Sequence, residues 1–203
     1  GNSNFNIDLT FFRKRIDTDE FNSIRLTSSK LDFDQLFSYL PPSNQEESST
    51  NDHTSAFNIF EVPFSNTNFD ITIDKMNYHR YLLNDFELNG RMQTDHYFYL
   101  DKMSMKTAGG SFNLKGYFNG SNPKSIYFSP DLNVHEFDLD KLLFKFDNFG
   151  QDQLVSDNLK GTLSGSIQGK IKMRPDLIPI IEDSELTMDI RVLDGSLNNF
   201  SAF

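Results

Sequence analysis

The stretch Leu159–Lys172, with the sequence LKGTLSGSIQGKIK, alternates apolar residues and glycines with polar residues along its whole length. One face carries Leu159, Leu163, Ile167 and Ile171, and the other carries lysine, serine, threonine and glutamine. Because successive side chains of a strand point to opposite faces, this pattern predicts a strand with one apolar and one polar face. At roughly 3.3 Å per residue it spans about 45 Å, far more than an ordinary strand.

Three glycines, Gly161, Gly165 and Gly169, lie among the apolar residues of this strand. Glycine weakens a strand, and its presence there often marks a bend or the close approach of another group. We therefore expect a curved sheet, with room beside Leu163 and Ile167 on its apolar face.

The same alternation recurs in four other stretches: Phe69–Asp74, Phe86–Met92, Phe112–Phe118 and Leu186–Val192. Further strands are expected near Phe5–Phe12, Ser23–Lys30 and Tyr97–Thr107. The Gly109-Gly110 pair predicts a hairpin and Asp194-Gly195 another turn. The fold class that follows is mainly β: a long, curved antiparallel sheet, shaped like a groove or an open barrel, with a few short helices.

Two short helices are expected at equivalent places. Asp32-Phe-Asp34 and Asp138-Leu-Asp140 each follow strand-like sequence and precede a short apolar segment, and acidic residues in that position are typical helix caps. The recurrence of the same context indicates an internal repeat. We therefore interpret 1–40 as the end of a preceding repeat, 41–56 as a flexible polar loop or linker, and 57–203 as a β module truncated at its C-terminal end.

Composition excludes several classes of function. The net charge of -10 argues against nucleic acid as a partner, since phosphate binding needs clustered cations. The absence of cysteine excludes disulfides and thiol chemistry. No apolar run is long enough to span a membrane.

Catalytic and metal-binding motifs are not found. The histidines His53, His79, His96 and His135 are scattered, without the spacing of a zinc site. Asp138 and Asp140 are the best-spaced carboxylate pair, and we interpret them as helix caps. Glu182–Glu185 is expected to form an acidic turn, at most a weak cation site. We predict no catalytic residue, no metal and no cofactor, and hence a protein that is not an enzyme.

Four stretches resemble the AsmA-like family of bacterial envelope proteins: Met103–Gly116, Val134–Phe144, Leu159–Ile171 and Leu186–Asn198. The resemblance implies a repeated, strongly curved sheet with an apolar groove, similar to TamB-like and bridge-like lipid-transfer proteins. It also implies a periplasmic location, anchorage to the inner membrane through a segment absent from this sequence, and a part in outer-membrane biogenesis. The implied partners are phospholipids or their acyl chains and other envelope proteins.

The apolar face predicted to line the groove consists of Phe112, Leu114, Phe118, Leu159, Leu163, Ile167 and Ile171. This face is either a core covered by the short helices or a groove left open to acyl chains, and the sequence leaves both readings open. Two other functions also stay open. One is a structural or protein–protein module of the envelope, and the other is a carbohydrate-binding β-sandwich with Tyr97 and Tyr99 as exposed aromatic residues.

Overall fold

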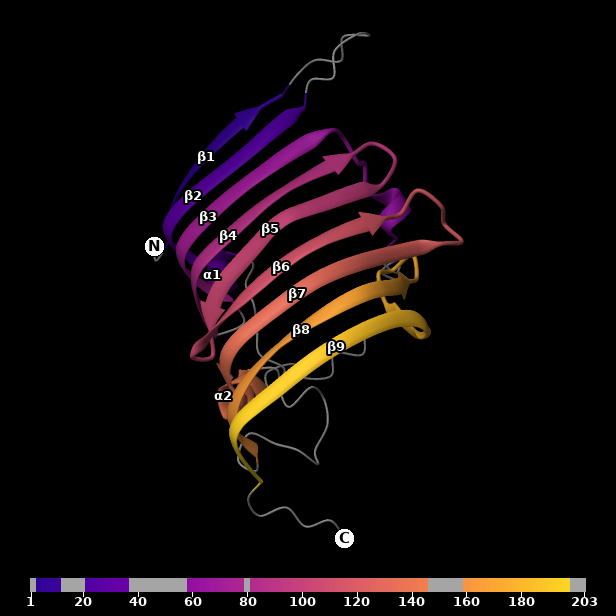
Figure 1. Ribbon diagram of the computed structural model, residues 1–203. Helices are drawn as coiled ribbons and strands as arrows, with labels where there is room; N and C mark the ends of the chain where they lie inside the picture. The colour runs from indigo at the N-terminus through magenta and orange to yellow at the C-terminus, as the bar shows by residue number, and fades with distance from the viewer. Residues whose placement is uncertain (1–2, 12–20, 37–57, 79–80, 146–158, 198–203) are drawn as a thin grey trace, which may run out of the picture.

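A computed structural model describes residues 3–11, 21–36, 58–78, 81–145 and 159–197. They form one nine-stranded sheet in which the spatial order of the strands follows the chain (Figure 1). The strands are β1 Asn4–Thr10, β2 Asn22–Asp32, β3 Thr67–Tyr78, β4 Tyr81–Gln93, β5 Tyr97–Thr107, β6 Gly110–Asn119, β7 Ile126–Asp138, β8 Leu159–Met173 and β9 Pro179–Leu197. The predicted fold class, a long curved sheet with few helices, is confirmed. A single sheet does not fit the β-sandwich alternative.

One strand pair departs from the expected antiparallel arrangement. Every neighbouring pair is antiparallel except β2 and β3, which are parallel. A parallel pair needs a connection that carries the chain back to the starting end of the sheet. The long segment between Asp32 and Thr67 supplies that connection. The predicted loop 41–56 lies within it, outside the described residues.

Of the two glycine-containing turns that were predicted, one is confirmed and one is wrong. The hairpin between β5 and β6 is confirmed, because Thr107 pairs with Gly110 across Ala108 and Gly109, which both have positive φ. The turn expected at Asp194-Gly195 is wrong: β9 continues through it, with Asp194 at a φ of 51° where the pairing register shifts.

The acidic turn expected at Glu182–Glu185 is also wrong, because these residues lie inside β9. They form a bulge, where the pairing jumps from Lys170–Glu185 to Lys172–Ile180. The Ser184 hydroxyl stabilises the bulge by accepting a hydrogen bond from the Lys172 backbone N–H (3.0 Å). A bulge accommodates the extra residues without ending the strand.

An apolar row crosses all nine strands. Its members are successive pairing partners, one from each strand: Ile7, Leu26, Ile71, Leu88, Met103, Leu114, Leu132, Ile167 and Met188. We call the face that carries this row the inner face, and the opposite one the outer face. Each member keeps some exposure to solvent, so the inner face is apolar but not sealed.

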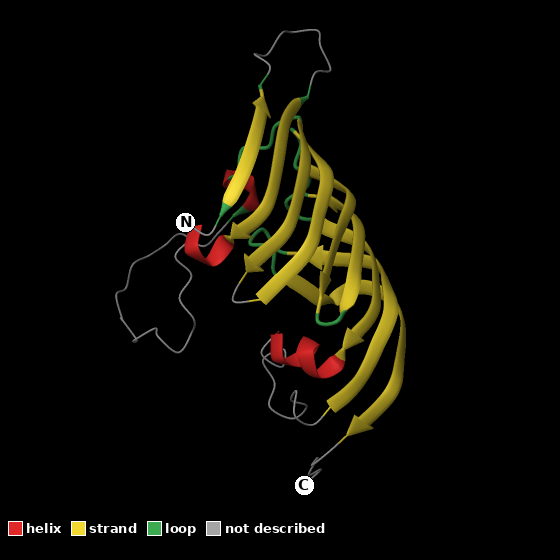
Figure 2. Cartoon of the chain, turned by 90° about the vertical axis from the view of Figure 1, so that its left-hand side faces the viewer, coloured by secondary structure: helices red, strands yellow, loops and turns green. Residues whose placement is uncertain are grey.

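Among the described residues, helices cover the inner face near its two ends. The helices α1 Phe33–Leu36 and α2 Leu139–Lys145 follow β2 and β7 at one end, on the concave side of the sheet (Figure 2). At the other end the 3-10 helix η2 Ile59–Glu61 packs Ile59 against Phe118 and Ile126. No helix of the described part of the chain covers the middle of the sheet between them.

The cap at α1 can be tested by mutation. Asp32 Oδ1 accepts a hydrogen bond from the Gln35 backbone N–H at 3.0 Å, as an N-cap does. We expect Asp32→Ala to lower the free energy of unfolding by about 1 kcal/mol, measured by urea denaturation. Asp32→Asn retains the acceptor oxygen and should be close to the wild type. Equal losses in both variants would contradict a capping role.

Candidate functional site

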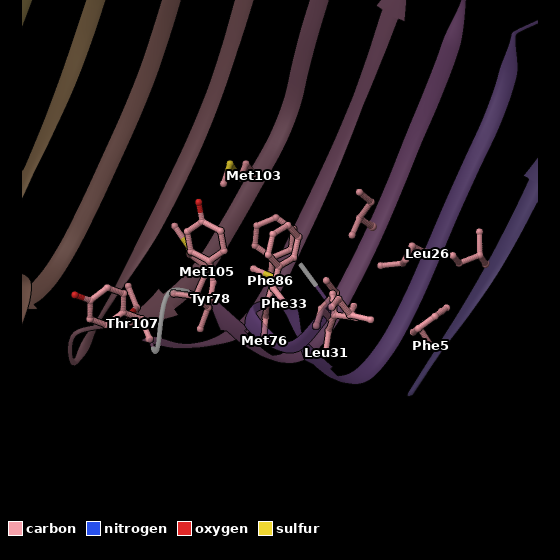
Figure 3. A pocket seen from close by; sticks show the side chains of 16 residues that line it. Phe5, Leu26, Leu31, Phe33, Met76, Tyr78, Phe86, Met103, Met105 and Thr107 are labelled. Atoms are coloured by element: carbon pink, nitrogen blue, oxygen red, sulfur yellow. The ribbon is translucent and has the colours of Figure 1, made fainter. Parts of the chain in front are cut away.

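A cavity of about 740 Å³ opens on the inner face between β1, β5 and α1 (Figure 3). Its lining consists of aliphatic, aromatic and methionine side chains, two tyrosines and one threonine. They are Phe5, Ile7, Leu26, Leu31, Phe33, Leu36, Ile71, Ile73, Met76, Tyr78, Tyr81, Leu83, Phe86, Met103, Met105 and Thr107. No charged side chain is among them.

The floor of this cavity is a buried apolar cluster. Leu31, Ile73, Met76 and Phe86 come from three adjacent strands and are each less than a tenth exposed. Ile73 pairs with Phe86, and Met76 pairs with both Leu31 and Leu83, so the β-sheet register itself sets their spacing. Side chains fixed in this way form a preorganised binding surface, which reduces the entropy cost of binding.

The wall and mouth of the cavity are more exposed than its floor. Phe33 of α1 packs edge-on against Tyr78, with ring centroids 5.4 Å apart. Phe5 is 51% exposed and Leu36 is 48% exposed, although both line the cavity. The cavity is therefore open to solvent at the side of β1 and α1, so that a ligand can enter without unfolding of the sheet.

The lining restricts the chemistry that this cavity can perform. Among its described residues, the only side-chain hydrogen-bonding groups are the hydroxyls of Tyr78, Tyr81 and Thr107. General acid–base catalysis at neutral pH needs groups such as histidine or a carboxylate, and the described lining residues include neither. Among the described residues no cluster of three or more metal-ligating side chains occurs. The cavity suits an apolar ligand that needs no charge neutralisation inside.

The seven residues predicted to line a groove lie in the other half of the sheet. Phe118 of β6 pairs with Phe128 of β7, which in turn pairs with Ile171 of β8. Leu114 is linked in the same way through Leu132 to Ile167. Phe118 is covered by η2, whereas the others keep partial exposure. None of Phe112, Leu114, Phe118, Leu159, Leu163, Ile167 and Ile171 lines the cavity.

The cavity residues could have been found from the sequence in part. The patterns of Phe69–Asp74 and Phe86–Met92 predict half-apolar strands, but nothing in them distinguishes these strands from those of the other half. What selects this half is the position of α1 and of β1. The position of α1 depends on the crossover from β2 to β3, and that of β1 on its antiparallel pairing with β2, and the alternation of residues encodes neither.

The glycines of β8 have a different role from the one expected. A Cβ atom on Gly165 or Gly169 would collide with the backbone carbonyl oxygen of Asp189 or Glu185 in β9. Gly161 has a φ of +133° and lies against the backbone of Leu193 and Gly195. The glycines therefore allow the close approach of β9, rather than opening space beside Leu163 and Ile167.

The polar residues considered for catalysis or metal binding make contacts that stabilise the fold. Asp138 forms an ion pair with Lys141 in the first turn of α2, and its backbone N–H donates to the Ala108 carbonyl (2.8 Å). His96 lies between β4 and β5, where its ring packs against Phe60 and Phe64 near η2. His53 and His79 lie outside the described residues.

Four tyrosines gather on the outer face, at the end of the sheet where η2 lies. Tyr97 and Tyr99 of β5 flank Tyr117 of β6, with ring centroids 6.0 and 4.9 Å from it, and Tyr127 of β7 lies 6.0 Å beyond. We call these four residues the tyrosine strip. The guanidinium of Arg91 lies 4.6 Å from the centre of the Tyr99 ring, and the ammonium of Lys170 lies 4.1 Å from that of Tyr127.

Tyr117, the central tyrosine of the strip, is expected to lose its proton at a higher pH than an ordinary tyrosine. Burial among its neighbours, with a smaller contribution from Tyr99, raises the pKa of Tyr117 to about 12 from its ordinary value of 10.0. A raised folded-state pKa means that the stability from neutral Tyr117 is complete below pH 10 and is lost as the pH rises towards 12. Titration at 295 nm should show a late phase that Tyr117→Phe removes. A late phase that survives this substitution would contradict the assignment.

No family model, curated protein or solved structure matches this chain. By its fold, the chain is an open curved β-sheet protein with an apolar concave face. Among the described residues, no helix has the length and apolar character needed to cross a bilayer.

Proposed function

We propose that this chain binds the acyl chains of lipids in its inner-face cavity and works without catalysis. The observation that carries the proposal is a cavity of about 740 Å³ that opens to solvent and whose described lining residues carry no charge. Pockets for small ligands usually combine apolar walls with a few polar groups. Here the polar groups are three hydroxyls among sixteen lining residues, which favours a hydrocarbon chain over a polar metabolite.

The energetics support an acyl chain as the occupant. Burying hydrocarbon contributes about 0.8 kcal/mol per CH₂ group, so ten groups contribute about 8 kcal/mol before the costs of association. A charged headgroup inside the cavity would lose its hydration without a partner. We infer that the headgroup stays at the mouth, near the exposed Phe5 and Leu36.

The apolar row extends this site beyond the cavity. It runs from Ile7 on β1 to Met188 on β9, and these two terminal members are 45% and 57% exposed. Large exposed apolar surfaces mark interaction sites in soluble proteins. A continuous apolar row across nine strands can contact a chain along the width of the sheet. We propose that this row is the route by which lipid enters or leaves the cavity.

We further propose that the chain is a periplasmic module of an AsmA-like envelope protein that takes part in lipid transport or outer-membrane biogenesis. This part of the proposal rests on the four sequence stretches that resemble the family and on the curved, open sheet that the resemblance implies. Partners would be phospholipids and other envelope proteins.

Native mass spectrometry of the purified chain, combined with organic extraction, tests the binding proposal. We expect a mass shift that corresponds to acyl lipid, and uptake of a fluorescent C16 fatty acid by the delipidated protein. The absence of extracted lipid together with the absence of fatty-acid uptake would overturn it.

A second candidate function is a structural module that joins other sheets through its edges. The outermost strands β1 and β9 each pair with one neighbour only within the described sheet. Unpaired edges are templates for pairing with another chain, and exposed apolar residues such as Leu9 and Ile190 accompany them. Self-association that persists in the delipidated protein, without fatty-acid uptake, would favour this function over lipid binding.

A further inference from the structure

The tyrosine strip has the features of a second binding surface, on the opposite face from the cavity. Its rings come from β5, β6 and β7, and all four tyrosines keep partial exposure. Register places Tyr99 opposite Tyr117, and Tyr97 opposite Asn119, whose side-chain amide donates to the Tyr127 hydroxyl at 3.1 Å. The strip is therefore an ordered surface in which ring faces and hydrogen-bonding groups adjoin.

Two cations mark the ends of the strip. Arg91 extends it to β4 and Lys170 extends it to β8, and both are exposed. With neighbouring strands about 4.8 Å apart, β4 and β8 are separated by roughly 19 Å. The strip thus forms an elongated surface that runs across the strands, with a positive charge at each end.

Neither end cation forms an ion pair with a carboxylate among the described residues. Six other basic side chains of the described residues do: Arg25, Lys102, Lys106, Lys141, Lys172 and Arg174. The chain carries a net charge of -10, so carboxylates are abundant. Arg91 and Lys170 instead lie over aromatic rings, which leaves their charge available to an anionic ligand.

The chemistry of the strip favours a saccharide. The C–H faces of sugar rings stack on aromatic faces, and their hydroxyls match amide and phenol groups such as those of Asn119 and Tyr127. Two separated cations complement a ligand that carries more than one carboxylate. Single-stranded nucleic acid also stacks on aromatic residues, but it presents a phosphate at every nucleotide and needs a more basic groove than two cations provide.

We propose that the tyrosine strip, with Arg91 at one end and Lys170 at the other, binds a linear saccharide that carries carboxylate groups and lies across β4 to β8. This site is independent of the lipid cavity. Neither the cavity nor the proposed entry of lipid uses any residue of the strip.

Isothermal titration of the full chain with hexagalacturonate tests the proposal, with maltohexaose as the uncharged probe. We expect hexagalacturonate to bind more tightly than maltohexaose, and its affinity to fall as salt is added, because exposed charges are screened. Arg91→Gln and Lys170→Gln should each weaken binding about threefold or more, as loss of an interfacial charge does.

Lys160→Gln is the matched control for Lys170→Gln. Lys160 lies on the same polar face of β8, roughly 33 Å along the strand from Lys170, and it is exposed. The control should bind hexagalacturonate as the wild type does. Tyr99→Leu should weaken both probes, which separates ring stacking from charge, provided that circular dichroism shows an unchanged sheet.

Several results would overturn the proposal. One is the absence of binding to either saccharide by a folded chain. Another is equal weakening by Lys160→Gln and Lys170→Gln, which would indicate general charge attraction. A third is tighter binding of oligothymidylate than of hexagalacturonate, which would assign the strip to nucleic acid.

Discussion

Leu83→Glu is expected to weaken uptake of a fluorescent C16 fatty acid by at least about tenfold, equivalent to about 1.4 kcal/mol. Leu83 lines the cavity and pairs with Met76 on its floor. A carboxylate there would face hydrocarbon without an ion-pair partner, because the described lining residues include no cation. Leu83 keeps partial exposure, so the sheet should tolerate the substitution better than it would at the buried Ile73.

Leu82→Glu provides a closely matched control. Leu82 is the preceding residue of the same strand, so its side chain points to the outer face, and it is 51% exposed. The two variants have the same composition and net charge. Leu82→Glu should take up the fatty acid as the wild type does. Equal loss in both variants would indicate a general effect on the sheet and would count against the cavity as the binding site.

The same pair of variants separates the two proposed sites. Neither substitution touches the tyrosine strip, so hexagalacturonate binding should be unchanged in both. Conversely, Arg91→Gln should leave fatty-acid uptake unchanged. A loss of both activities in any one variant would mean that the sheet itself had been disturbed.

The sequence could predict the strands because their pattern is local. Alternation in Leu159–Lys172 depends only on which face each residue occupies, and β8 begins at the predicted residue and ends one residue later. The inner-face row follows from the same rule, applied to nine strands that pair in chain order. The cap of α1 was also predictable, since Asp32 contacts a backbone N–H only three residues further on.

The place of the cavity could not be predicted, because it depends on long-range packing. The cavity forms where α1 follows β2 and where β2 runs parallel to β3, and Phe33 packs against the buried cluster on its floor. No alternation distinguishes β3 from β6 as a cavity strand. The tyrosine strip was missed as a unit for the same reason: Tyr97 and Tyr99 are close in sequence, but the register brings Tyr117 and Tyr127 beside them.

The glycines of β8 show how one pattern can carry two meanings. Glycine in a strand indicates either a bend or a close neighbour, and the sequence does not say which face the neighbour approaches. The structure shows the backbone of β9 at each of the three positions. Tight packing of β8 on β9 therefore explains these glycines, and it yields a prediction of large effect.

Gly165→Val is expected to lower the free energy of unfolding by about 2–3 kcal/mol, in the range of overpacking substitutions. Its Cβ would collide with the carbonyl oxygen of Asp189 and would lie 3.2 Å from the Cα of Ile190. Backbone atoms cannot rotate away as a side chain can, so β9 must move. Because β9 is an edge strand, amide hydrogen exchange should show the largest loss of protection between Met188 and Val192.

Ser166→Val, one residue further along β8, is the control for this experiment. It introduces the same β-branched side chain on the outer face, where a surface substitution usually changes stability by no more than about 0.5 kcal/mol. Urea denaturation of the two variants should therefore separate them clearly. If Gly165→Val were as stable as Ser166→Val, with β9 still protected, then the close approach of β9 would not be the reason for glycine at this position. Curvature of β8 would have to account for it instead.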